Sequence, residues 1–178
     1  LITSKTKAIV VVHLAGWPAK MHEINALASE KGITVIEDCA QAHGAQLKVN
    51  GEFRSVGSFS DISAWSFCQD KIISTGGEGG MVATSSQALW DEIWSVKDHG
   101  KTRESVFKKD HPPGYRMVHE RLGSNYRLTE FQSAIGRYQL KQLKKWTEIR
   151  TRNAMVIFEA IKDLPAVRTP LPNDDDEI

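Results

Sequence analysis

The sequence has few cysteines and no long apolar segment. Cys39 and Cys68 are its only cysteines, and they form neither a disulfide framework nor a paired CxxC metal motif. No stretch approaches the roughly 20 apolar residues that span a bilayer, and residues 1–7 lack the apolar core of a signal peptide. We therefore expect a cytoplasmic protein in a reducing compartment, with no membrane partner.

The chain also lacks a large net charge, because its 23 basic and 22 acidic residues give a formal net charge of +1. A balanced charge produces no overall field toward nucleic acid, and we expect no nucleic acid partner. The 178 residues are 40% hydrophobic and 25% charged, which is the composition of a folded, water-soluble domain.

Several common catalytic motifs are absent from the sequence. The six histidines show no HExxH spacing, and none pairs with cysteines in a zinc pattern, so we expect no metal site. The Gly-x-Ser-x-Gly elbow of serine hydrolases does not occur. The Gly-rich residues 74–80 lack the Gly-Lys-Ser/Thr end of a phosphate-binding loop, and Val82 stands where a dinucleotide fingerprint needs glycine. Glycine here is expected to let the backbone pass close to a bound group or another segment, or to form a tight turn.

The first half of the chain predicts strands in alternation with helices. Continuous apolar, β-branched runs such as residues 8–12 are typical of parallel strands buried on both faces. Asn50 and Gly51 predict a type I′ hairpin turn. One helix is expected to end at Gly32 and another to begin after Ser86. The expected strands are residues 8–12, 33–36, 46–49, 53–56, 62–67 and 81–84.

The second half is expected to contain a long loop and then a long helical region. Residues 101–124 are polar with a Pro-Pro-Gly centre, and loops of this length are usually functional or mobile. Thr129 and Gln132 predict a capping box that opens the helical region, with a bend near Leu143. An apolar stripe that reaches Leu164 is expected to pack in the core or against another domain.

Two charged residues lie where ligands bind in an open α/β sheet. Asp38 follows the second predicted strand, and Lys71 lies in the loop after residues 62–67, so both are at the carboxyl edge of the sheet. Taken alone, Lys71 would usually be a surface charge, and Asp38 would as often cap a helix as act in catalysis. The surrounding sequence is needed to assign them.

Four blocks of sequence surround these two residues. They are residues 12–16 (VHLAG), 37–44 (EDCAQAHG), 66–81 (SFCQDKIISTGGEGGM) and 125–130 (NYRLTE). In this order they resemble the strand end, the cofactor aspartate motif, the lysine region and the helix-opening motif of the DegT/DnrJ/EryC1/StrS aminotransferases. The departures from the family pattern, mainly at residues 69–70 and 77, remove no chemical group that the mechanism needs.

The resemblance implies an α/β fold, a three-layer α-β-α arrangement with a mostly parallel sheet that is part of the large cofactor-binding domain of a fold-type I aminotransferase. Residues 1–142 would belong to this domain, and residues 143–178 would form a long helix and the start of the C-terminal small domain. The family's Gly-Thr phosphate loop and its stacking aromatic residue would precede these residues. We therefore expect the chain to be a piece of a longer polypeptide.

The resemblance also assigns roles to five residues. Lys71 would form the Schiff base with pyridoxal 5′-phosphate (PLP), and Asp38 would be the partner of the pyridine nitrogen, which a carboxylate keeps protonated. Gln41 would lie near the phenolic oxygen, Ser66 would bond the phosphate, and Asn125 would reach the phosphate in the neighbouring active site of a homodimer. Structural roles stay open for these last three residues, namely a helix cap, a buried strand hydroxyl and the start of the long helix.

The implied reaction moves an amino group from glutamate to a keto-sugar nucleotide, in surface polysaccharide or amino-sugar biosynthesis, with ping-pong kinetics. One alternative is a dehydratase of the same family, which uses pyridoxamine phosphate and has histidine in place of the lysine. Others are a cysteine desulfurase of the same fold type and a non-catalytic fragment that cannot complete a site. Donors for a sugar-nucleotide diphosphate could come from the long loop, although a solvated loop is equally open. These donors are Arg103, His111, Tyr115, Arg116 and His119.

Overall fold

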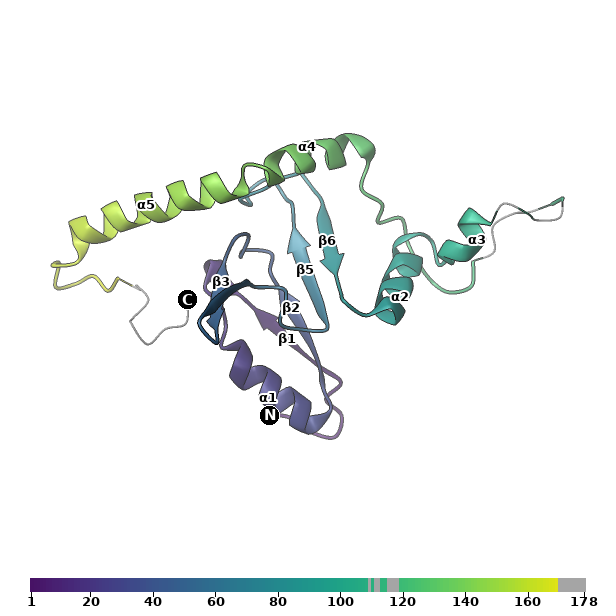
Figure 1. The fold of residues 1–178 in the computed structure, drawn as a ribbon, viewed down its shortest axis with the longest axis horizontal. Coiled ribbons are helices and arrows are strands. Elements are labelled where there is room, and N and C mark those ends of the chain that lie inside the picture. Colours follow the sequence, from purple (N-terminus) through teal and green to yellow (C-terminus); the bar gives the residue numbers. More distant parts are fainter. Residues whose placement is uncertain (109, 111–112, 115–118, 170–178) are drawn as a thin grey trace.

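A four-stranded sheet forms the centre of the chain, in the order β1-β2-β5-β6 (Figure 1). The computed structural model describes residues 1–108, 110, 113–114 and 119–169. The first three strands, β1 (Ala8–Val12), β2 (Thr34–Asp38) and β5 (Ile62–Ser66), run parallel, and β6 (Gly80–Ala83) pairs antiparallel with β5. The prediction of an α/β fold with a mostly parallel sheet is confirmed.

The unit from β1 through α1 (Met21–Lys31) to β2 forms the main core. Gly32 ends α1 in the left-handed conformation, with φ of 62°, as its sequence position predicts. One cluster of buried side chains packs between α1, the sheet and a hairpin. It contains Val11, Met21, Ala28, Val35 and Leu47.

The prediction that residues 8–12 are buried on both faces is wrong for this chain. Val11 is 6% exposed, but Val10 and Val12 are 62% and 48% exposed. Side chains alternate between the two faces of a strand, and only the face of Val11 is covered by described residues. β1 therefore has more apolar side chains than the described residues bury.

The predicted hairpin is confirmed. β3 (Gln46–Val49) and β4 (Glu52–Ser55) pair antiparallel. Asn50 and Gly51 connect them with φ angles of 51° and 86°, the positive values that a type I′ turn requires. The hairpin brings Leu47 into the core cluster.

The helices after β6 agree with most local predictions. Ser86 caps α2 (Gln87–Lys97), and Thr129 and Gln132 form the predicted capping box of α4 (Glu130–Leu140). A separate α3 (Arg103–Phe107) begins after Thr102 inside the expected long loop, and the sequence analysis missed it. Three of the loop donors proposed from the sequence, His111, Tyr115 and Arg116, lie outside the described residues.

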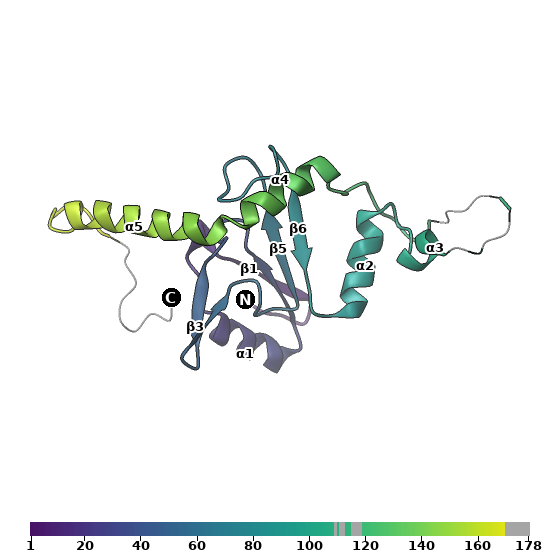
Figure 2. The ribbon, with the colours of Figure 1, turned by 45° about the horizontal axis from the view of Figure 1, so that its top comes forward.

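The long helical region breaks between α4 and α5 (Leu143–Ile161), as predicted. Figures 1 and 2 show α4 lying across the end of the sheet where β5 stops and α5 running on beyond the sheet to one side. No residue of α5 is buried, and Ile157 is 58% exposed, so the predicted core packing of its stripe does not occur within the described chain. Among the described helices, none is long and apolar enough to cross a bilayer.

Candidate cofactor site

The predicted site residues follow strands that end at one edge of the sheet. Because β1, β2 and β5 are parallel, their carboxyl ends lie along the same edge of the sheet, at the end where α4 crosses (Figure 1). Asp38 is the last residue of β2 and Ser66 is the last residue of β5. Gln41 and Lys71 lie in the segments that follow these strands.

A cavity of about 290 Å³ opens at this edge, and both Gln41 and Lys71 line it. Asp38, Ser66 and Asn125 are not among its lining residues. A larger cavity of about 940 Å³ lies beside β6, α2 and the start of α4, and none of the five predicted site residues lines it. The smaller cavity is therefore the candidate site. Its other lining residues are Ala15, Ala40, His43, Asp70, Ile72 and Arg150.

Lys71 presents the only lysine amine among the residues that line the smaller cavity. Its side chain is 17% exposed, and its Nζ lies 3.3 Å from Oδ2 of the largely exposed Asp70. The pKa of the Asp70 carboxyl is lowered below its usual value. The largest cause is a hydrogen bond that the Cys68 thiol donates to it, and the next is a hydrogen bond from Lys71. An amine held at the wall of a cavity can react with a carbonyl group that enters it.

Asp38 and Gln41 form a turn that faces the end of β1. Oδ1 of Asp38 accepts a hydrogen bond from the Ala40 amide at 3.0 Å, while Oδ2 has no partner among the described residues. Oε1 of Gln41 accepts from the Ala15 amide at 2.6 Å, which orients the side-chain amide so that its NH₂ group remains available as a donor. This turn thus offers one free carboxylate oxygen and one free amide donor.

Ser66 ends β5, and residues 67–79, which include Lys71, form the loop that leads to β6 and is called the glycine-rich loop below. The Ser66 hydroxyl accepts from the Cys68 amide at 3.3 Å, so its own proton remains available for another acceptor. The two ends of the loop are joined by backbone hydrogen bonds from Phe67 to Gly79 (2.8 Å) and from Thr75 to Phe67 (3.1 Å). These bonds fix the loop from within.

The glycine-rich loop also packs tightly against itself and against α4. A Cβ on Gly79 would overlap the buried Thr75, and one on Gly136 of α4 would lie 2.8 Å from Cγ2 of Thr75. At Gly80 a Cβ would lie 2.9 Å from the carbonyl oxygen of Trp65 in β5, so the expectation that glycine lets the backbone approach another segment is confirmed there. Gln132 and Gln139 of α4 add hydrogen bonds to the loop, to the Glu78 carbonyl (2.7 Å) and from the Ser74 amide (2.8 Å).

His43 is a cavity residue that the sequence analysis did not single out. It is 3% exposed, and its ring lies 5.4 Å from that of Trp65 and 5.9 Å from that of Phe67. The pKa of His43 is lowered, mainly because the ring is buried. The backbone of Ser66 acts to raise this pKa, and the positive charge of Lys71 acts to lower it. His43 is therefore neutral at pH 7 and forms an uncharged wall beside the lysine.

Asn125 lies apart from the other predicted site residues. It is exposed, and it forms an antiparallel bridge with Asp98 at the end of α2. Burial acts to raise the pKa of Asp98, but the hydrogen bond from Arg127 (2.6 Å) and the positive charges of Arg127, Lys97 and Lys101 together outweigh it, and the pKa is lowered. Asn125 is thus fixed by its neighbours but is not brought to the Lys71 cavity within one chain.

The free groups at this edge fit PLP. The cofactor needs an amine for its aldehyde, a carboxylate for its pyridine nitrogen, and donors for its phenolic oxygen and phosphate. The described chain offers one group of each kind: the Lys71 amine, Oδ2 of Asp38, the Gln41 NH₂ group and the Ser66 hydroxyl. The last three are free to form a further hydrogen bond within the described chain.

Known proteins resemble this chain in both sequence and structure. It is 42% identical over 153 residues to UDP-N-acetyl-3-dehydro-alpha-D-glucosamine 3-aminotransferase of Acidithiobacillus ferrooxidans, which covers 86% of this chain and 37% of the relative. It is 43% identical over 166 residues to GDP-perosamine synthase of Escherichia coli O157:H7, which covers 93% of this chain and 42% of the relative.

The X-ray structure of an aminotransferase from Psychrobacter cryohalolentis matches with a TM-score of 0.85 and 55% sequence identity, over 93% of this chain and 41% of that one. The chain therefore spans about two fifths of the length of these relatives. The sequence matches one family across residues 1–177. The chain belongs to the DegT/DnrJ/EryC1/StrS aminotransferase family.

Proposed function

We propose that the intact protein containing these residues is a PLP-dependent aminotransferase that moves an amino group from glutamate to a keto-sugar nucleotide. The observation that carries the proposal is the position of Lys71, whose partly buried amine shares a cavity with Gln41 at the carboxyl edge of the sheet. Family membership supports it, as do the names of relatives that act on UDP- and GDP-linked sugars.

Each site residue has a role that follows from its free groups. When bound, PLP supplies an electron sink that stabilises negative charge at the α-carbon of an amino acid. Asp38 would hold a proton on the ring nitrogen through its free Oδ2. Lys71 would bind the cofactor and carry a proton at Nζ. The Gln41 amide would orient the phenolic oxygen, and the Ser66 hydroxyl would donate to the phosphate.

The proposal includes a homodimer in which Asn125 completes the neighbouring active site. Its support is the exposure of Asn125, its distance in the fold from the lining of its own chain's cavity, and the contacts with Asp98 that hold its backbone in place. An exposed but rigidly held amide is suited to contact a group on another subunit.

The test uses the intact protein with PLP, ¹⁵N-labelled glutamate and a panel of 3-keto and 4-keto sugar nucleotides. We expect a visible absorption band on PLP addition and transfer of ¹⁵N to one of the sugars, detected by mass spectrometry. Lys71→Ala should abolish both, because no other amine lines the cavity at this position. Lys48→Ala, at an exposed lysine of β3, is the matched control and should keep both.

Four results would contradict the proposal. Loss of water from a keto sugar without ¹⁵N transfer would indicate the dehydratase, and sulfide release from cysteine would indicate the desulfurase. If the visible band survives in Lys71→Ala, the lysine assignment is wrong. Failure of the intact protein to bind PLP would leave the non-catalytic reading.

A further inference from the structure

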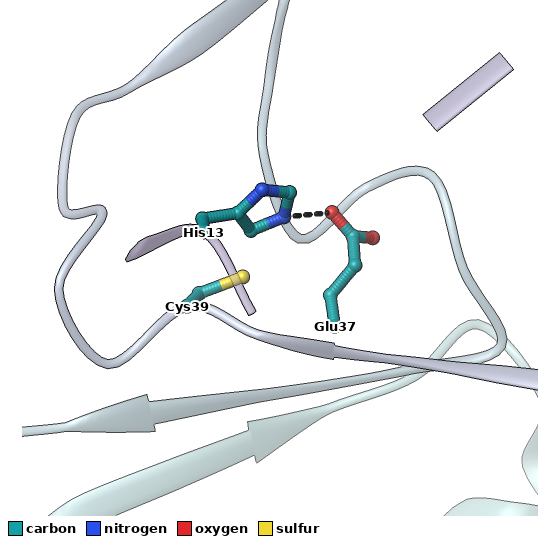
Figure 3. Close-up of side chains that lie close together, drawn as sticks. All are labelled: His13, Glu37 and Cys39. Carbon is teal, nitrogen blue, oxygen red and sulfur yellow. Dashed lines mark hydrogen bonds and ion pairs between the residues drawn. The ribbon is translucent and has the colours of Figure 1, made fainter. Parts of the chain in front are cut away.

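His13, Glu37 and Cys39 form a buried cluster at the carboxyl ends of β1 and β2 (Figure 3). All three side chains are fully buried. Nε2 of His13 lies 2.9 Å from Oε2 of Glu37, and Figure 3 shows the two groups facing each other, with the Cys39 sulfur beside them. The cluster has the residue types of a metal site, so its hydrogen bonds decide what it does.

Glu37 is saturated by hydrogen-bond donors. Its Oε2 accepts from His13 Nε2 and from the Gly57 amide at 2.6 Å. Its Oε1 accepts from the Phe59 amide at 2.9 Å and from the Ser60 hydroxyl at 2.7 Å. A carboxylate has about four acceptor positions, so none is left for a cation. A buried charge is tolerated when it is bonded in this way.

The other two members of the cluster are equally unsuited to a metal. Nδ1 of His13 accepts from the Ala19 amide at 3.0 Å, which places the ring proton on Nε2, toward Glu37. Burial, followed by the negative charges of Glu37 and Asp38, raises the pKa of the Cys39 thiol to about 12. Because metals bind the thiolate, a metal at Cys39 would first have to displace this proton.

The His13–Glu37 pair lies next to the contacts that join the end of β1 to the end of β2. The His13 amide extends the β1–β2 ladder by donating to the Asp38 carbonyl at 3.1 Å. The short turn η1 (Leu14–Gly16) follows, and its Ala15 amide binds Gln41. Gly16 lies so close to the Gln41 carbonyl that a Cβ would be 3.0 Å from its oxygen. The ends of β1 and β2 are therefore joined where Asp38 and Gln41 face the cofactor edge.

We propose that His13 and Glu37 are positioning residues for the PLP site. Glu37 ties the end of β1, through His13, to β2 and to the loop over residues 57–60, and so sets the orientation of Asp38 and Gln41. The inference rests on the proposed function, because it names what holds that same site. Neither residue touches the cavity, so both act through Asp38 and Gln41.

The test compares His13→Asn and Glu37→Gln with wild type in the intact protein. Asparagine can still accept from the Ala19 amide, but its shorter side chain places no donor at the position of Nε2, which bonds to Glu37. Glutamine at position 37 turns an NH₂ group toward donors that the carboxylate accepts from. Glu52→Gln, at an exposed carboxylate of β4, is the matched control. If His13→Asn and Glu37→Gln both fail to fold, Ser60→Ala, which removes one donor from Glu37, gives the same comparison in a milder form.

Two measurements are made well below the melting temperature. The first is hydrogen exchange of the Ala15 amide in the PLP-free protein, which we expect to be about tenfold faster in both variants because its bond to Gln41 loosens. The second is PLP affinity, which we expect to fall about 10- to 100-fold, as when a group that orients a ligand-binding side chain is removed. The control should change neither.

Three outcomes separate the alternatives. A lower melting temperature with normal Ala15 exchange and normal PLP affinity would show that the pair only stabilises the fold. One equivalent of divalent metal in wild type that is lost in His13→Asn would show a metal site. Both results overturn the inference. If wild type does not bind PLP, the proposed function fails. Faster Ala15 exchange in the variants would still show that His13 and Glu37 hold the ends of β1 and β2 together.

Discussion

Glu37 and Asp38 are adjacent carboxylates of one strand with opposite environments. Consecutive side chains of a strand point to opposite faces, so Glu37 enters the core while Asp38 is half-buried at the cofactor edge. Burial acts to raise the pKa of Glu37, but hydrogen bonds from His13, Gly57, Ser60 and Phe59 outweigh it, and its pKa is lowered. The same strand end thus carries one carboxylate whose acceptor positions are all used within the fold and one that keeps an oxygen free among the described residues.

The lowered pKa of Glu37 predicts a loss of stability in acid. Its ordinary pKa is near 4.5, and the folded state holds it lower, so the unfolded state binds the proton more readily. The stability contributed by Glu37 is complete above pH 4.5 and is lost as the pH falls through the folded-state pKa. We expect urea unfolding of PLP-free Glu37→Gln to show a lower free energy of unfolding at neutral pH and a weaker acid dependence than wild type.

The exposed Glu52 provides the control for this pH experiment. Glu52→Gln removes the same charge from the chain but no buried hydrogen bond, so its stability should follow the wild-type pH dependence. If Glu37→Gln keeps the full acid dependence of wild type, the carboxylate of Glu37 is not its source.

At the scale of single residues, sequence alone predicts roles for Lys71 and Asp38 because each sits in a contiguous block with a family pattern, and these roles stay predictions. His43 lies in one of those blocks too, but nothing in sequence showed that it lines the cavity. Arg150 lines the same cavity from α5, far along the chain, and no local sequence pattern predicts such a contact. Cavity walls of this kind depend on tertiary packing.

Among the helices, α4 acts as a support for the glycine-rich loop. Gln132 and Gln139 bind the loop's backbone on either side of Thr75, and Gly136 allows the helix to lie directly against Thr75. Thr75 is 1% exposed, and its hydroxyl donates to the Glu78 carbonyl at 2.9 Å, so it has little freedom to move away. The position of Lys71 therefore depends on how closely α4 approaches.

Gly136→Ala is the sharpest test of this contact. In a helix with free space, replacing glycine by alanine stabilises by about 1 kcal/mol. Here the new Cβ would lie 2.8 Å from Cγ2 of the buried Thr75, and overpacking of this kind costs about 1–3 kcal/mol. We expect overpacking to dominate, so that urea unfolding shows a destabilised protein and PLP titration shows weaker binding.

The exposed Arg137, next to Gly136 on α4, supplies the comparison. Arg137→Ala also raises the alanine content of the helix, but the side chain that it removes is exposed, so it should leave stability and PLP affinity close to wild type. A stabilised Gly136→Ala would mean that α4 does not press on Thr75 in solution.

Local chemistry explains which elements could be predicted. The Asn50-Gly51 turn, the Gly32 terminus and the Thr129 capping box are each specified by residues next to one another, and all were found. The short α3 was missed because its only local signal is Thr102, which caps it by accepting from Ser105 at 3.2 Å. The exposure of β1 depends on what covers the sheet, which strand patterns do not report.

On the scale of the whole molecule, much apolar surface remains uncovered. Val10 and Val12 on β1, Met81 and Val82 on β6, and Phe131 on α4 are all at least 46% exposed. These residues lie on the two edge strands of the sheet and on α4, and apolar side chains left exposed in such number indicate contacts with other protein segments. This exposure agrees with a chain that spans about two fifths of its relatives' length, and the boundary near residue 142 stays a prediction.

Mixed dimers test whether Asn125 completes the partner's site. If it does, a dimer of one Lys71→Ala and one Asn125→Ala subunit has one doubly damaged site and one site with both residues intact. Random association of equal amounts gives half mixed dimers, so we expect about a quarter of wild-type activity from two nearly inactive proteins. If Asn125 acts in its own subunit, every site carries one lesion and mixing restores nothing. Aminotransferase assays before and after subunit exchange distinguish the two arrangements, with the double variant Lys71→Ala/Asn125→Ala mixed with wild type as the control for exchange.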